Sequence, residues 1–327
     1  MLKRSAPNPR QNADLSIQIQ LPNEWSPDLA KVNVGITAGV ETDRCNPLWI
    51  ECINRMSAII VPSKHVERTF RNTGTITVPV HVVPEAFHDA CKEPPNGTPI
   101  ELSTSFNLLV VGQLTGNNQV TDRKNTFSTI KWLCELFNDD HDVGIVVKTN
   151  MGRNSCVDRQ QTVALMRQLL TEVRPTSTFP RLHLLHGDMS DAEIASLYYH
   201  PTMKALVTTT RGEGFGLPIL EAAACGLPVV ATNWSGHLDY MNMGRFVSLD
   251  YNMQAVHPSR IDGSIFMEGA RWAEVQESSF KQRLKKFRAS SFTPKQWALE
   301  LRQKLLRTHS FEAVSAAYDR ALNEVIA

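Results

Sequence analysis

The segment from residue 211 to residue 240 carries the residue types best suited to chemistry. Two carboxylates, Glu213 and Glu221, lie eight residues apart in it. Three glycines surround the first carboxylate: Gly212, Gly214 and Gly216. Pro218 suits the first turn of a helix, where the missing N–H of proline costs nothing, and Gly226 suits the position after a last turn. The sequence therefore predicts a glycine loop that leads directly into a short helix.

These groups suit a diphosphate that carries hydroxyl groups at both ends. Backbone N–H groups at a helix N-terminus attract anions, and glycines let a diphosphate come close. Carboxylates accept charge-assisted hydrogen bonds from ribose or hexose hydroxyls. Glu213 is expected on the loop at the end of a strand and Glu221 inside the helix, so both can face the crevice where open α/β sheets bind ligands. The chemistry points to a nucleotide-diphosphate sugar.

Alternating strands and helices must position this segment. Short apolar runs predict strands, and the segments between them predict helices. The expected strands are 17–21, 32–37, 58–61, 80–83, 106–111, 143–148, 182–185, 205–209 and 228–232. The expected helices are 47–56, 64–72, 125–137, 158–173, 190–199 and 218–224, and the chain after residue 279 is also helical. This alternation predicts an α/β protein with parallel sheets that helices cover on both faces.

Length and composition suit two globular domains. The chain has 327 residues, of which 42% are hydrophobic and 20% charged, a composition that excludes disordered and fibrous proteins. The segment 92–99, KEPPNGTP, is the expected linker. We predict a disordered arm over residues 1–14, an N-terminal domain over residues 15–95 and a C-terminal domain over residues 100–327.

Charge and cysteine usage exclude several classes of protein. The 34 Lys and Arg residues nearly balance the 33 Asp and Glu residues, so the surface is not that of a general nucleic-acid binder. No two of the six cysteines form a C-x-x-C pair, which argues against a zinc site or a disulfide framework. The polar N-terminus is not a signal peptide, and no apolar stretch could span a membrane. We expect a cytoplasmic protein with no metal site. The acidic run 139–142 is not expected to bind a metal either.

The segment 213–232 resembles the signature of a known family. Its sequence, EGFGLPILEAAACGLPVVAT, is similar to that of the retaining GT-B glycosyltransferases of family 4, also called group 1. The resemblance extends from about residue 32 to the C-terminus, through VNVGITAGVETD, VHVVPEAFHD, LLHGDMSDAEIASLYY and HSFEAVSAAYDRAL. It implies two Rossmann-like domains that face a cleft, with a closing helix that crosses back to the first domain. Phage-encoded members of the family carry this kind of signature in compact chains, so a compact phage-type member is one interpretation of the sequence.

The resemblance also implies roles for the signature residues. Glu221 matches the carboxylate that holds the ribose hydroxyls, and Glu213 matches the one that contacts the transferred sugar. Four residues match the backbone donors at the sugar and the diphosphate: Gly214, Phe215, Gly216 and Leu217. Met189 lies where the backbone of the family meets the nucleobase. The donor is therefore expected to be a nucleotide-diphosphate sugar, a UDP-sugar by preference, with no further cofactor.

A basic pair of the family falls on the loop that begins at Gly112. The lysine of the pair is Lys124, beside Arg123, whereas Gln113 replaces the first arginine. Because glutamine brings no charge, diphosphate binding should depend more on Lys124, with support from Arg123 or Lys148. Lys124 and the helix N-terminus would stabilise the charge that grows on the leaving group, and transfer would retain the anomeric configuration without a metal.

The first domain is expected to form the side of the cleft that binds the acceptor. Glu41 is the preferred catalytic partner from this domain, and Ser63 is a weaker candidate that also suits a helix cap. His237 and Asp239 near the signature are interpreted as structural. Acceptors that remain open are a saccharide, a glycan and a modified DNA base; the basic residues after residue 279 suit DNA, although a solvated helix face explains them better.

The first domain is too short for the family, since only about ninety residues precede the linker. We therefore expect one face of its sheet to be bare and to be covered by a second copy of the chain or by a partner. The main hypothesis is an active retaining glycosyltransferase that moves a hexose or another sugar. The alternative is a catalytically degenerate donor-binding protein that serves as the partner of another glycosyltransferase.

Overall fold

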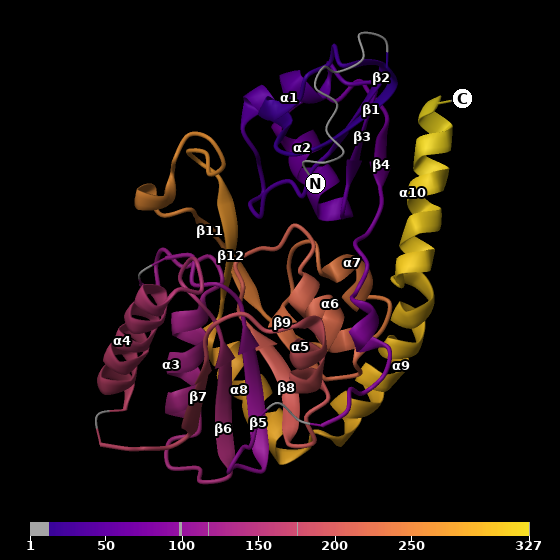
Figure 1. The fold of residues 1–327 in the computed structure, drawn as a ribbon. Helices are drawn as coiled ribbons and strands as arrows, with labels where there is room; N and C mark the ends of the chain where they lie inside the picture. Colours follow the sequence, from indigo (N-terminus) through magenta and orange to yellow (C-terminus); the bar gives the residue numbers. More distant parts are fainter. Residues whose placement is uncertain (1–12, 98–99, 117, 175, 327) are drawn as a thin grey trace.

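The computed structural model describes residues 13–97, 100–116, 118–174 and 176–326. Two parallel sheets form two lobes, with the N-terminal lobe (residues 13–91) above the C-terminal lobe (residues 100–310) in Figure 1. The predicted α/β class, with parallel sheets between helices, is confirmed. The first strand begins at Ala13, so the end of the predicted arm is wrong, and residues 1–12 lie outside the described part.

The N-terminal lobe has a four-stranded parallel sheet in the order β1-β2-β3-β4. Its strands are β1 (Ala13–Ile19), β2 (Ala30–Ile36), β3 (Ala58–Val61) and β4 (Val80–Val82). Its helices are α1 (Pro47–Ile53), α2 (Lys64–Thr73) and the short 3-10 helices η2 (Pro22–Glu24) and η3 (Asp89–Cys91). The side chains of Asn46 and Ser63 accept backbone N–H groups and so fix where α1 and α2 begin.

The C-terminal lobe has a six-stranded parallel sheet in the order β10-β9-β8-β5-β6-β7. Its strands are β5 (Phe106–Val111), β6 (Val143–Lys148), β7 (Arg181–Leu185), β8 (Met203–Thr208), β9 (Val229–Thr232) and β10 (Val247–Leu249). Its helices are α3 (Thr126–Leu136), α4 (Cys156–Val173), α5 (Asp191–Tyr198), α6 (Leu217–Ala224), α7 (Leu238–Met241), α8 (Glu277–Ala289) and α9 (Phe292–Thr308). The strand order reverses between β5 and β8, which is where sheets of this type bind ligands.

A hairpin that the sequence did not predict connects the two lobes. Its strands β11 (Tyr251–Ala255) and β12 (Arg271–Val275) are antiparallel, with the 3-10 helix η4 (Pro258–Arg260) between them. The hairpin, orange in Figure 1, rises from the C-terminal lobe. Val256, Phe266 and Trp272 of this segment share one core with Trp49 and Phe70 of the N-terminal lobe. The C-terminal part of the chain therefore completes a core of the N-terminal lobe.

The last helix, α10 (Phe311–Ile326), covers the other face of the N-terminal sheet. Val314 and Ala321 pack there against Val34, Ile60 and Val83. The prediction that one face of the N-terminal sheet is bare is therefore wrong. The covering helix is the closing helix that the family resemblance places against the first domain, whereas the expected bare face followed from the helices of the first ninety residues alone. Exposed apolar side chains of this lobe include two on the edge strand β1, where Ile17 is 45% and Ile19 76% exposed.

Candidate active site

Two loops meet at the point where the strand order reverses. The loop after β5 carries Arg123 and Lys124, and the loop after β8 carries Glu213. Asp122 shapes the first loop, because its fully buried carboxylate accepts the backbone N–H groups of Lys124 and Thr126 at 3.2 and 2.7 Å. The topology therefore brings residues that are 89 positions apart into contact.

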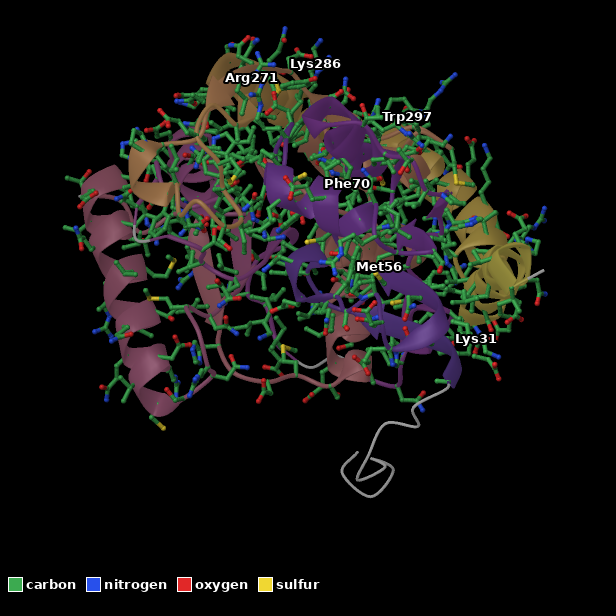
Figure 2. The ribbon with its side chains drawn as sticks, turned by 90° about the horizontal axis from the view of Figure 1, so that it is seen from above. Lys31, Met56, Phe70, Arg271, Lys286 and Trp297 are labelled. Atoms are coloured by element: carbon green, nitrogen blue, oxygen red, sulfur yellow. The ribbon has the colours of Figure 1, made fainter. Side chains whose placement is uncertain are left out.

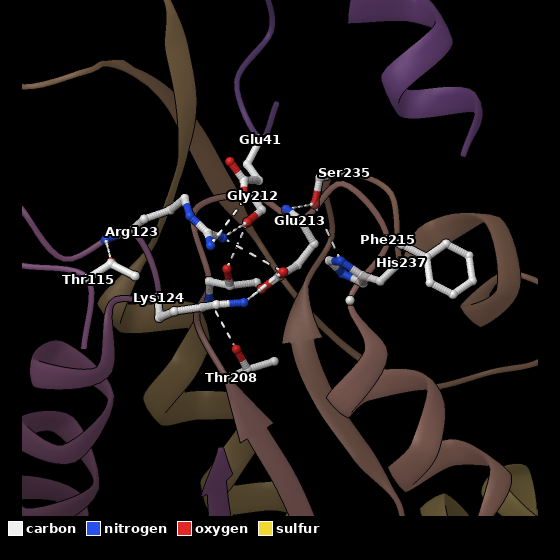
Figure 3. A network of polar contacts seen from close by, with 12 residues as sticks. Glu41, Thr115, Arg123, Lys124, Thr208, Gly212, Glu213, Phe215, Ser235 and His237 are labelled. Carbon is white, nitrogen blue, oxygen red and sulfur yellow. Dashed lines mark hydrogen bonds and ion pairs between the residues drawn. The ribbon is translucent and has the colours of Figure 1, made fainter. Parts of the chain in front are cut away.

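Glu213 lies at the centre of a polar network that includes both lobes (Figure 3). Lys124 Nζ donates to both carboxylate oxygens of Glu213, at 2.7 and 2.8 Å. Arg123 lies 3.7 Å from Glu213 and 3.1 Å from Glu41 of the N-terminal lobe. Arg123 also donates to the backbone oxygen of Gly212 at 2.7 Å. Four residues selected from the sequence thus meet in one cluster of two cations and two carboxylates.

The neighbouring cations keep Glu213 ionised. Burial raises the pKa of the Glu213 carboxyl, but Lys124 and Arg123 outweigh burial and lower that pKa to about 2. The side chain of Glu213 is only 9% exposed. A buried carboxylate of this kind is a strong acceptor for hydroxyl groups of a ligand that enters the site.

The N-terminal lobe lies directly on the glycine loop. A Cβ atom at Gly212 would lie 2.0 Å from the backbone oxygen of Glu41, and one at Gly214 would lie 2.5 Å from that of Ala38. Ser63 Oγ donates to the Gly214 oxygen at 2.6 Å. These two glycines therefore make room for the backbone of the other lobe.

Ser63 and Asp239 both act where the lobes meet. Ser63 caps α2, as its structural interpretation predicted, and also contacts the glycine loop. Asp239 Oδ2 accepts the backbone N–H of Lys64 at 2.6 Å, so its structural interpretation also agrees with the geometry. His237 is fully buried, and its Nε2 lies 2.8 Å from the Thr232 oxygen. Burial lowers the pKa of the His237 imidazole.

Helix α6 presents Glu221 beside a buried tyrosine. Gly216 precedes the helix in a left-handed conformation with φ of 91°, and Pro218 lies in the first turn. Tyr198 Oη donates to Glu221 Oε2 at 3.2 Å. Burial raises the pKa of Glu221, although the Tyr198 hydrogen bond lowers it. Phe215 is buried against Tyr240 in the C-terminal lobe.

Gln113, Lys148 and Met189, which were also predicted to bind the donor, lie outside the Glu213 network. The Gln113 side chain donates to the Met151 oxygen at 3.4 Å. Lys148 Nζ donates to the Gly187 oxygen, and burial lowers the pKa of this lysine. Met189 is partly buried against the apolar core around α6. Gly112 is in contact with the network, since a Cβ there would lie 3.6 Å from the Lys124 side chain.

Sequence reasoning missed three residues that support this site. Ser235 Oγ accepts the backbone N–H of Glu213 at 3.0 Å. Tyr198 binds Glu221, and the buried Arg211 binds the loop that carries Lys124. Arg211 stands beside the glycine loop in the sequence, so its position was a signal for a supporting role. The chain offered no comparable signal for Tyr198.

Neither a metal site nor a membrane helix is found in the described part of the chain. Within residues 13–97, 100–116, 118–174 and 176–326, no group of three or more His, Cys, Asp or Glu side chains could hold a metal ion. Asp140 and Asp142 of the acidic run instead pair with Arg288. Of the helices in these ranges, none has the length and apolar character needed to cross a membrane.

Comparisons with known proteins agree with this geometry. A family model described as glycosyl transferases group 1 matches residues 181–257. That range contains the glycine loop, Glu213 and Glu221. No curated protein sequence matches the chain.

Solved structures share the fold at low sequence identity. A sucrose-phosphate synthase from Thermosynechococcus elongatus matches with a TM-score of 0.64 and 11% identity, over 95% of this chain and 73% of its own. A trehalose-6-phosphate structure from E. coli, bound with UDP-2-fluoro glucose, matches with a TM-score of 0.66 and 10% identity, over 97% of this chain and 74% of its own. A glycosyltransferase from Rickettsia africae ESF-5 matches with a TM-score of 0.64 and 14% identity, over 96% of this chain and 77% of its own. The predicted GT-B fold and the resemblance to group 1 glycosyltransferases are confirmed.

Proposed function

Because the chain has the GT-B fold and residues 181–257 match group 1 glycosyltransferases, we propose that it moves a sugar from a nucleotide-diphosphate sugar to an acceptor. The C-terminal lobe would bind the donor, and the N-terminal lobe would offer the acceptor. The contact of Lys124 with Glu213 carries this proposal, because it holds a cation and a carboxylate together at the ligand-binding edge of the sheet. A UDP-sugar is the preferred donor, since the E. coli neighbour was solved with one.

Donor binding would replace the ion pair between Lys124 and Glu213. The diphosphate brings negative charge that attracts Lys124, and the sugar brings hydroxyl groups that donate to Glu213. Lys124 then exchanges the carboxylate for the diphosphate, and Glu213 exchanges its ion pair for charge-assisted hydrogen bonds, so neither is left buried without a partner. Glu221, held by Tyr198, would accept the hydroxyl groups of the ribose.

The chemical step follows from the position of these charges. As the bond from the anomeric carbon to the diphosphate breaks, negative charge grows on the leaving oxygen. Lys124 and the N-terminus of α6 would stabilise that charge. The acceptor hydroxyl would attack from the side of the leaving group, so the anomeric configuration is retained. Glu41 would take part from the N-terminal lobe, next to Arg123. We propose that the reaction needs neither a metal nor a further cofactor.

A panel of nucleotide sugars tests donor binding directly. Thermal unfolding is measured for the wild type, for Glu221→Ala and for the control Glu300→Ala, an exposed carboxylate on α9. A donor at one hundred times its Kd should stabilise the wild type and the control by about 2.7 kcal/mol. The stabilisation should disappear in Glu221→Ala. No shift with any donor in folded wild-type protein would contradict the donor site and favour the degenerate-partner alternative.

Transfer to an acceptor tests the reaction itself. Incubation with the stabilising donor and a set of saccharide, glycan and hydroxymethylated DNA acceptors should give one glycosylated product. The coupling constant of the new anomeric proton in the NMR spectrum should match that of the donor, as retention requires. An inverted product would contradict the proposed mechanism while leaving the donor site intact.

The basic residues of the C-terminal helices do not favour DNA over the other candidate acceptors. Lys281 pairs with Glu135 and Glu277, and Arg288 pairs with Asp140. Figure 2 shows Lys286 of α8 at the outer edge of the molecule. These positions favour the solvated-face interpretation, and DNA stays one acceptor among those to be tested.

The expected partner or second copy and the expected cytoplasmic location are still predictions. A second copy or a partner would now have to cover the edge of β1 at Ile17 and Ile19, and light scattering that shows a monomer at micromolar concentration would argue against it. We also place the activity in the cytoplasm, an expectation supported by the six free cysteines.

A further inference from the structure

Arg211 lies behind the loop that carries Arg123 and Lys124. It follows β8 and is only 5% exposed. Its Nη1 donates to the backbone oxygens of Gln119 at 2.8 Å and Asp122 at 2.6 Å. Its own backbone N–H donates to the Arg123 oxygen at 2.9 Å. One buried side chain and its backbone thus bind three positions of a single loop.

The loop has a second support on its inner side. The carboxylate of Asp122 accepts hydrogen bonds from the backbone N–H groups of Lys124 and Thr126 and, at 3.1 Å, from that of Thr115. Thr115 Oγ1 accepts the N–H of Arg123 at 2.8 Å. Asp122 therefore binds N–H groups of the loop, whereas Arg211 binds its carbonyl groups. The two supports fix both the course of the backbone and the direction in which Lys124 leaves it.

The hairpin holds Arg211 in turn. Glu274 of β12 pairs with Arg211 Nε, and the guanidinium carbon lies 5.4 Å from the centre of the Trp272 ring. The Arg211 oxygen accepts the N–H of Ala273 at 2.9 Å. Because Glu274 neutralises its charge and its donors are engaged with the loop, Arg211 is not a free cation for a diphosphate.

The same strand also holds the N-terminal partner of the network. Arg271 of β12 donates from its backbone N and from Nε to Asp43, at 2.7 and 2.9 Å. Asp43 lies two residues after Glu41, which pairs with Arg123. Strand β12 is therefore connected to both sides of the contact between Arg123 and Glu41.

We infer that Arg211 is the positioning residue of the proposed reaction, which holds the loop so that Lys124 meets Glu213 and the donor. This inference rests on the proposed function, because it assigns the loop a role in transfer. Arg211 acts through Lys124 and does not touch the reacting atoms. A displacement of about 1 Å at a reacting group can slow a reaction by two orders of magnitude.

Hydrogen exchange tests the positioning role without any need for activity. The full chain is compared with Arg211→Met, with the milder Arg211→Lys and with the control Arg288→Met. Arg288 has the same kinds of contact, an ion pair with Asp140 and a guanidinium carbon 4.6 Å from the Phe106 ring centre, but it lies away from the loop. In Arg211→Met the amides of Arg123, Lys124 and Thr126 should exchange at least tenfold faster, while the strands of the C-terminal sheet exchange as in the wild type. Unchanged loop exchange, or an equal increase throughout the lobe, would overturn the inference.

A double-mutant cycle tests whether the role operates through Lys124. Arg211→Met should lower kcat about 30- to 100-fold with a smaller change in KM, Arg211→Lys should lower it less, and Arg288→Met should leave it within twofold. In a Lys124→Met background, Arg211→Met should reduce kcat by less than threefold further. The full loss in that background would overturn the inference. A wild type that transfers no sugar would refute the proposed function instead, while hydrogen exchange would still decide the role of Arg211 in the loop.

Discussion

The two lobes of the molecule bury their sheets in different ways. In the C-terminal lobe, α3, α4 and α8 cover one face of the sheet and α5, α6 and α9 cover the other. In the N-terminal lobe, α1 and α2 share a core with the hairpin of residues 251–275, and α10 covers the opposite face. The N-terminal lobe therefore depends on segments from the C-terminal end of the chain, at residues 251–275 and 311–326.

This difference decides how each half of the candidate site is held. Lys124 and Glu213 come from loops of one sheet, so the packing of the C-terminal lobe positions both. Glu41 reaches the same network only because the N-terminal lobe is fixed in place, through Ser63 and through the contact of Asp43 with Arg271. Changes in distant segments should therefore affect Glu41 before they affect Glu213.

The largest effect is expected from a charge on the inner face of α10. Val314 is 6% exposed within the core that this helix forms with the N-terminal sheet. An aspartate there would be buried without a partner, so Val314→Asp should lower the free energy of unfolding by about 5 kcal/mol or more. Hydrogen exchange should show β2 and β3 losing protection before β5 and β6.

Ser315→Asp is the matched control, because Ser315 is the next residue and is exposed. It should change the free energy of unfolding by less than about 0.5 kcal/mol. Equal loss of protection in both lobes for Val314→Asp would mean that they unfold as one unit. The comparison between the lobes would then hold for packing but not for stability.

Truncation of the hairpin tryptophan should come next. Trp272 is 2% exposed and packs edge-on to Phe266, with ring centres 5.8 Å apart. Trp272→Ala should cost about 3–5 kcal/mol, as large core truncations do. Trp132→Ala in α3 should cost a similar amount, since Trp132 is 7% exposed and packs on Phe280. Of the two variants, only Trp272→Ala should loosen β2 and β3 in hydrogen exchange; the same pattern in both would contradict the dependence of the N-terminal lobe on the hairpin.

The same contrast explains what the sequence could predict. Strands such as 58–61, 106–111 and 143–148 are short apolar runs, and the structure has them at those residues. The helix predicted over 190–199 is also present, as α5, and the capping box of Ser190 and Glu193 that begins it is a local interaction. The region 241–278 has no comparable pattern, because its apolar residues are spaced to fit another lobe. The hairpin and the cover of the N-terminal sheet therefore could not be derived from local spacing.

The site was predicted to a similar extent. The signature placed Glu213 and Glu221 on the loop and the helix, where the structure has them. The basic pair that the family resemblance places on the loop after Gly112 led to Lys124 and its neighbour Arg123, which do meet Glu213. Arg211, Ser235 and Tyr198 support these residues through contacts between distant segments, which residue types alone do not reveal.

The network between the lobes should make stability depend on acid. The pKa of Glu213 is about 2 in the folded chain and has an ordinary value of 4.5. A lowered pKa of this kind adds stability that is present above pH 4.5 and is lost as the pH falls towards 2. The amide introduced by Glu213→Gln does not titrate, so the advantage of the wild type over this variant should narrow by roughly 1.4 kcal/mol for each pH unit below 4.5. Urea unfolding at pH 7, 4.5 and 3.5 measures the difference, and a constant difference would show that the cations do not stabilise the carboxylate.

The smallest effect is expected within the C-terminal lobe alone, at Tyr198. Its hydroxyl donates to Glu221 and lowers the pKa of that carboxyl against the raising effect of burial. Tyr198→Phe removes one hydrogen bond, worth about 1 kcal/mol, so the nucleotide-sugar Kd should rise about fivefold. Without the hydrogen bond the pKa of Glu221 should rise further, so binding should weaken more on acidification in the variant than in the wild type. Tyr199→Phe is the control, because Tyr199 donates to the Cys91 oxygen at 2.7 Å and not to Glu221. Calorimetric titration of both variants measures the Kd, and equal weakening in the two would mean that the hydroxyl of Tyr198 supports only the packing of α5, not the carboxylate on α6.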